Sequence, residues 1–256
     1  MKLKSWAGPT ATVLLVACMC ATVPPPSQAF TLTANLTPDV LGAPTNLSTR
    51  MTLTEGGGVP KPVSGVVAYG PAGLRLNVQG IATCERTSLE VEGPRGCPAE
   101  SRVGFGGGVG LVDLGATTVK ESYTLDFFLA PREQGHLRIL VYVDALRPIP
   151  VELVLSAKEV PASSPYGFGL AVEVPPIATV PGGANVSVES SFVSLGASNV
   201  AYYRTVHDKR ELVHIRGLIA PAKCPKAGFP FETIVTFEDG TTGTGKYLAP
   251  CPGGHR

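Results

Sequence analysis

The sequence lacks both a long apolar run and an excess of charge of either sign. Its longest apolar stretch, residues 11–23, has 13 residues, whereas a membrane-spanning helix needs roughly 20. The chain carries 21 basic and 20 acidic side chains. Because nucleic acids and anionic lipid surfaces attract clustered basic side chains, we predict neither as a partner, and we expect no transmembrane segment in the mature chain.

Catalytic and cofactor motifs are missing too. The G-x-S-x-G, S-x-x-K and H-E-x-x-H signatures of common hydrolases do not occur. Residues 240–246 have the spacing of a phosphate-binding loop, but Tyr247 stands where a serine or threonine must hold magnesium. Residues 104–110 lack the spacing of a dinucleotide site, so we interpret them as a glycine-rich strand or bulge. We predict no catalytic residue, no cofactor and no metal site, and an enzyme is disfavoured.

The N-terminus has the pattern of an export signal. Two lysines precede the apolar stretch, three prolines follow it, and small residues stand at positions 27 and 29, where a signal peptidase reads them. We predict a signal peptide over residues 1–29, cleaved between Ala29 and Phe30, and hence a secreted protein. A second interpretation stays open, because residues 15–18 look like a lipobox. Lipid attachment at Cys18 would anchor the protein at the cell envelope.

Four cysteines remain after removal of the signal, an even number that suits an oxidising compartment. Three pairings are possible in principle. We favour the local ones, Cys84 with Cys97 and Cys224 with Cys251, because each closes a short loop between expected neighbouring strands and contributes roughly 3 kcal/mol. A zinc site built from all four is disfavoured, because cysteine pairs in such sites stand about two to four residues apart.

Glycine and proline, with 30 and 24 residues, interrupt every helical pattern and leave short strands as the main elements. The patterns of apolar residues predict strands at residues 74–79, 123–129, 137–143, 151–155, 170–174, 186–195 and 229–237. The Asp239-Gly240 pair indicates a hairpin, and residues 86–93 are a candidate helical turn. We predict an all-β fold, an antiparallel β-sandwich or barrel-like sheet, in a single domain over residues 30–256. Residues 161–165 are either a joint between two halves or a loop within one sheet.

The stretch from residue 202 to 216 is the most ligand-like. It reads as two strands joined at residues 208 and 209, with Tyr203 opposite His214 and His207 opposite Arg210. Aromatic, imidazole and guanidinium groups on one face could bind a sugar, an anionic polymer or a partner, such as the cell wall or another extracellular polymer. The alternative, which we favour, is the solvated face of an edge hairpin, because charged hairpin edges are common.

Several short segments together carry a resemblance. They are residues 68–74, Cys84, residues 97–104, 126–131, 224–225, 228–231, 237–240 and 251–252. As a set they resemble a family of exported proteins of unknown function from high-GC soil actinobacteria, over nearly the whole mature chain. The resemblance implies export and one domain, and it brings no activity, cofactor or catalytic residue.

Three functional hypotheses follow. We favour a non-catalytic extracellular or cell-envelope protein, because no reactive constellation occurs. A carbohydrate- or ligand-binding module comes second, and the absence of tryptophan after Trp6 weighs against the carbohydrate version. A secreted hydrolase comes third, and it requires one of His136, His207 and His214 to lie beside a serine and an acid.

Overall fold

The computed structural model describes residues 29–54, 58–78, 80–113, 117–145, 150–177, 185–196, 201–214 and 217–252. The predicted signal peptide, with Cys18, lies outside these residues apart from Ala29, at which the first strand begins. Among the described residues, no helix is long and apolar enough to cross a membrane.

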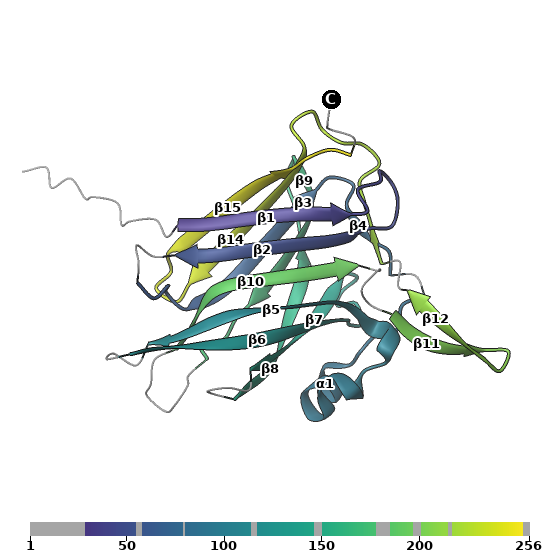
Figure 1. The fold of residues 1–256 in the computed structure, drawn as a ribbon, viewed down its shortest axis with the longest axis horizontal. Helices are drawn as coiled ribbons and strands as arrows, with labels where there is room; N and C mark the ends of the chain where they lie inside the picture. Colours follow the sequence, from purple (N-terminus) through teal and green to yellow (C-terminus); the bar gives the residue numbers. More distant parts are fainter. Residues whose placement is uncertain are drawn as a thin grey trace, which may run out of the picture.

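One antiparallel sheet of 11 strands curls round on itself and forms most of the molecule (Figure 1). In spatial order its strands are β1 (Ala29–Thr37), β2 (Asn46–Thr54), β10 (Val186–Gly196), β5 (Arg102–Asp113), β6 (Thr118–Leu129), β7 (Arg138–Ala145), β8 (Val151–Val160), β9 (Tyr166–Glu173), β3 (Val63–Pro71), β14 (Phe229–Phe237) and β15 (Thr242–Ala249). The predicted all-β antiparallel class is therefore confirmed, in its barrel-like form.

The two edges of the sheet, β1 and β15, meet and nearly close the barrel. The ring of Phe30 on β1 lies directly over Gly245 on β15, so closely that a Cβ atom at that glycine would collide with it. Leu32 of β1 packs beside the same glycine. Glycine at position 245 therefore permits the close approach through which side chains seal the seam between the edges.

Three clusters of apolar side chains line the inner face of the sheet, as alternation along each strand requires. At one end of the barrel, strand-end residues such as Leu36, Phe229 and Leu195 meet the segment that carries Leu74 and Leu76. This segment was predicted as a strand over residues 74–79, and that prediction is wrong in extent. Only β4 (Arg75–Leu76) pairs, with the equally short β13 (Leu218–Ile219), because the segment mainly inserts side chains into the barrel end.

A small helical layer covers the outer face of β6, β7 and β8. It consists of α1 (Arg86–Glu92), where a helical turn was predicted, and two 3-10 turns at Gly93–Gly96 and Ala99–Ser101. Leu89 of α1 is fully buried and packs with Phe128, Leu140 and Val154 from the sheet. The disulfide Cys84–Cys97 encloses α1 and the first of these 3-10 turns.

The second disulfide, Cys224–Cys251, joins the loop after β13 to the chain after β15. Both predicted pairings are thus confirmed. Residues 161–165, considered as a joint between halves, form the loop between β8 and β9, which are hydrogen-bonded neighbours in the same sheet. The Asp239-Gly240 hairpin between β14 and β15 is also present as predicted.

Candidate functional site

The inner face of β5 is a row of glycines. Gly104, Gly106, Gly108 and Gly110 stand at alternate positions, so they share one face of the strand. In the register of the sheet, Gly108 lies between Ser191 of β10 and Tyr123 of β6. A Cβ atom at Gly108 would come within 2.5 Å of the Tyr123 hydroxyl oxygen. The absence of side chains at these glycines therefore makes room on the inner face of β5 for larger side chains of β6, such as Tyr123.

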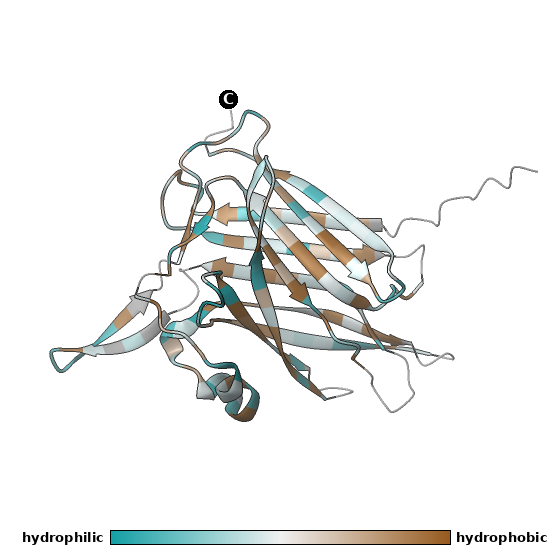
Figure 2. Ribbon diagram, turned by 180° about the vertical axis from the view of Figure 1, so that it is seen from behind, coloured by the Kyte–Doolittle hydropathy of each residue, from teal (hydrophilic) through white to brown (hydrophobic). Residues whose placement is uncertain are grey.

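A cavity of about 310 Å³ lies inside the barrel. Its walls are almost wholly aliphatic or aromatic, and they come from strands on every side of the sheet, including Val66 on β3, Val143 on β7, Leu155 on β8, Val172 on β9 and Val188 on β10. These five side chains are only partly buried although they point inward. They are partly exposed because they face the cavity rather than other side chains. In Figure 2, hydrophobic residues, coloured brown, recur along several strands of the sheet.

Few polar side chains reach this cavity. On β6, Glu121 and Tyr123 precede Leu125 and Phe127 on the inward face. Glu121 is only 3% exposed. The Tyr123 hydroxyl donates to the carbonyl oxygen of Ser190 at 3.1 Å. Burial raises the pKa of Tyr123 to about 12, against a smaller opposing effect of its hydrogen bond with the Ser191 side chain.

A second carboxylate, Glu238, lies at the rim of the cavity, at the end where Glu121 stands. Both of its oxygens accept hydrogen bonds from the Asn185 amide nitrogen, at 2.9 and 2.7 Å. Asn185 directly precedes β10, whereas Glu238 directly follows β14. This contact therefore spans the end of the barrel past β2, β1 and β15, the strands that separate β10 from β14 around the nearly closed sheet.

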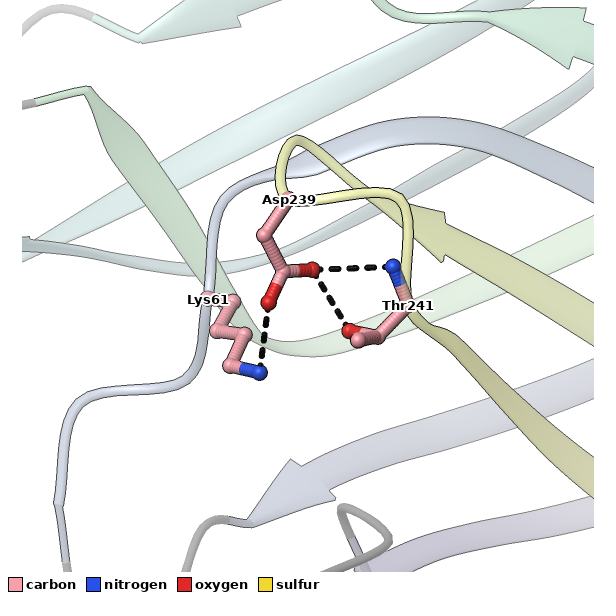
Figure 3. Close-up of polar contacts among 3 residues, drawn as sticks. All are labelled: Lys61, Asp239 and Thr241. Carbon is pink, nitrogen blue, oxygen red and sulfur yellow. Dashed lines mark hydrogen bonds and ion pairs between the residues drawn. The ribbon is translucent and has the colours of Figure 1, made fainter. Parts of the chain in front are cut away.

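The turn beside Glu238 is held by Asp239 (Figure 3). Its carboxylate accepts hydrogen bonds from the Lys61 ammonium at 2.6 Å and from the Thr241 backbone and hydroxyl at 2.9 and 2.6 Å. The contact with Lys61, followed by those with Thr241, lowers the pKa of Asp239 to about 2. Asp239 thus fixes the turn that presents Glu238 to the rim.

The predicted binding face lies elsewhere, on a hairpin of β11 (Ala201–Val206) and β12 (Lys209–His214) that projects from the barrel beside α1 (Figures 1 and 2). Its turn is at His207 and Asp208, one residue earlier than predicted, with φ angles of 49° and 61°. The predicted pairing is therefore wrong. Tyr203 lies opposite Leu212, and His214 pairs through its backbone with Ala201.

Part of the predicted aromatic and cationic group does form. The Arg210 guanidinium stacks over the Tyr203 ring at 4.2 Å from its centroid. His207 is exposed in the turn, and the side chain of His214 lies outside the described part of the molecule. None of the described residues of this hairpin lines the cavity.

The remaining candidates from the sequence are dispersed. His136 is exposed in the turn between β6 and β7, an element separate from the β11–β12 hairpin that carries His207. Residues 240–246, with the spacing of a phosphate loop, form the turn and first half of β15. Within the described ranges, no three His, Cys, Asp or Glu side chains gather as a metal site would require.

Sequence reasoning missed the cavity. Among the glycines 104, 106, 108 and 110 only Gly110 lines the cavity, so the glycine spacing did not by itself indicate it. Comparison of the chain with protein-family models, curated proteins and solved structures finds no match.

Proposed function

We propose that this chain is an exported, non-catalytic binding protein that holds an apolar small molecule inside its barrel. The observation that carries the proposal is the cavity of about 310 Å³ with its apolar wall. Binding sites for small molecules are mostly apolar, are largely formed in advance, and start at about 300 Å³. A cavity of roughly 150 Å³ already accommodates benzene, so twice that volume suits a ligand of about twelve non-hydrogen atoms.

The hydrophobic effect supplies the driving force. Val143, Leu155 and Val172 retain exposed surface toward the cavity, and a ligand would remove that surface from water. Each methylene group of an alkyl chain contributes about 0.8 kcal/mol on burial. A chain of about ten methylenes thus gains roughly 8 kcal/mol before the cost of association, which sets micromolar affinity as the upper limit.

Export is supported by two features. The N-terminal pattern of residues 1–29 is that of a cleaved signal. The two disulfides, Cys84–Cys97 and Cys224–Cys251, are of a kind that persists in oxidising compartments. A carrier or sequestering protein outside the cytoplasm fits both features and the cavity.

The test places a large side chain inside the cavity by substitution of a small residue that lines it. Ala68 of β3 lines the cavity, and its neighbours in the register are Thr233 and Leu170. The Ala68→Phe variant would occupy the space, whereas Ala171→Phe places the same ring on the opposite face of the adjacent strand β9. The probe is decanol, an uncharged ligand of about eleven non-hydrogen atoms, close to the size that the cavity suits, and titration calorimetry measures its binding.

We expect saturable binding of decanol by the wild-type protein and by Ala171→Phe, and at least about tenfold weaker binding by Ala68→Phe. Circular dichroism confirms that both variants are folded. Absence of saturable binding to the wild-type protein, or equal binding by a folded Ala68→Phe variant, would overturn the proposal.

A further inference from the structure

The cavity is long for its volume. Its lining runs from Val63 to Gly70 on β3 and from Val186 to Leu195 on β10. Strand residues advance by about 3.4 Å each and barrel strands tilt by about 40°, so the stretch on β3 alone corresponds to roughly 18 Å along the barrel axis. A compact cavity of about 310 Å³ would be only about 8 Å across, which is about two or three residue steps on a strand. The space inside the barrel is therefore a tunnel.

Apolar side chains close one end of this tunnel. A Cβ atom at Gly70 would lie 2.8 Å from Leu74 Cδ2, 3.9 Å from Phe168 Cδ1 and 3.9 Å from Phe231 Cε1, so these three side chains converge at the end of β3. All three line the cavity. Leu74 and Phe231 are each only 4% exposed. Leu74, Phe168 and Phe231 therefore form a floor, and we use that name for them below.

The opposite end of the tunnel reaches solvent. There the lining includes Pro175, two residues after β9, and Glu238, directly after β14. Both residues are exposed. The strand β14 thus carries Phe231 of the floor near its beginning and leads to Glu238 at the rim. A molecule inside the tunnel has an apolar dead end on one side and water on the other.

From this shape we infer that the barrel holds a single unbranched chain in extended form, with its apolar tail at the floor and its polar head at the rim. The inference rests on the proposed function, because it names the class of ligand that the cavity would hold. Extended chains advance by about 1.2 Å per bond, so a twelve-carbon alcohol spans roughly 14 Å and fits within the tunnel. The floor side chains offer a hydroxyl group no hydrogen bond, whereas a head at the rim keeps its contact with water.

The first experiment tests the shape of the ligand. Decanol and 1-adamantanol each have ten carbons and one hydroxyl group, but the first is a flexible chain and the second a compact cage. Titration calorimetry measures both with the wild-type protein, disulfides intact. We expect decanol to bind at least about tenfold more tightly, because an extended chain buries apolar surface along the whole wall and the cage contacts only a short part of it. A compact cavity would reverse this order.

The second experiment tests the orientation of the chain. Trp6 is the single tryptophan of the sequence, so a Trp6→Phe background allows one reporter tryptophan at a time. Phe168→Trp places the reporter at the floor, Pro175→Trp at the rim, and Leu248→Trp on the exposed outer face of β15 as the control. Bromine quenches tryptophan emission on contact. Dodecanol with bromine on its terminal carbon should quench the floor reporter saturably and the rim reporter much less, whereas bromine beside the hydroxyl-bearing carbon should give the reverse. Neither ligand should quench the control saturably.

The outcomes are distinguishable from a failure of the proposed function. Circular dichroism confirms that each reporter variant is folded, and Leu47→Trp replaces Phe168→Trp if the latter is not, since Leu47 lines the cavity and packs against the cluster of Leu74 and Phe231. If decanol binds but 1-adamantanol binds as tightly, or if terminal bromine quenches the rim reporter rather than the floor reporter, the extended, tail-inward chain is wrong while the apolar site stands. If decanol does not bind the wild-type protein, the proposed function itself is wrong.

Discussion

Removal of the disulfide Cys84–Cys97 should lower stability by an amount that the structure allows us to estimate. The bond joins cysteines 13 positions apart, and a loop of that length corresponds to about 3 kcal/mol in the chain-entropy description. Cys84 is also fully buried against Leu89 and Phe128, so its replacement by alanine leaves a small void that costs about 1 kcal/mol more. We expect the Cys84→Ala/Cys97→Ala variant to lose roughly 4 kcal/mol in total.

The loss should be concentrated in the helical layer. The helix α1 has only seven residues, too few to be stable alone, so it depends on Leu89 and on contacts with the sheet. One of these is the hydrogen bond from the Arg86 guanidinium to the Val154 carbonyl, at 2.8 Å. Without the disulfide, amide hydrogens of residues 86–92 should exchange faster than those of β5 or β14.

Calorimetric or circular-dichroism melting provides the assay. For a chain of this size, 1 kcal/mol shifts Tm by about 2–4 °C, so the expected decrease is about 8–16 °C. The Cys224→Ala/Cys251→Ala variant is the matched control, because it removes the other disulfide and leaves the helical layer bracketed. A decrease in Tm below about 2 °C, or uniform acceleration of exchange across the barrel, would refute the reasoning.

Two further predictions concern the buried tyrosine and the predicted processing. The pKa of Tyr123 is raised from 10.0 to about 12 in the folded protein, so its phenol loses its proton at a lower pH in the unfolded state than in the folded state. Up to about 3 kcal/mol of the free energy of unfolding should therefore be lost as the pH rises from about 10 to 12. Urea denaturation of Tyr123→Phe should lack this component, and an identical pH dependence in the variant would contradict the assignment. Intact mass of the protein from its producing cell should correspond to a start at Phe30 with four hydrogens fewer than the fully reduced chain. A lipid-modified start at Cys18 would instead show an anchored protein.

Much of the fold could be predicted because strand patterns and turn residues act locally. Phe229, Phe231 and Val235 share one face of β14, as their spacing required, and Asp239-Gly240 closes the hairpin that follows. The disulfides followed from short separations along the chain. The strand predicted at residues 74–79 was too long. Leu74 and Leu76 pack into the end of the barrel, and only the two-residue strand β13 pairs with this segment.

The candidate site was harder to predict, for a physical reason. Inward alternation of Val66, Leu155 and Val172 is the same whether these side chains fill a core or surround a space. Whether a gap remains depends on the number of strands and on the curvature of the whole sheet, which are global properties. The hairpin of residues 201–214 attracted the binding prediction because its side chains are chemically varied, but its register places Leu212 opposite Tyr203.

The seam between β1 and β15 implies an order of events in folding. The strands that meet there are the first and the last of the described chain, so the barrel can shut only after its final hairpin has formed. Contacts between such distant segments form slowly, because a long loop must be ordered first. Until Phe30 packs over Gly245, the interior of the barrel stays accessible. A ligand that is present during this interval could be enclosed as the chain folds, instead of entering a barrel that has already closed.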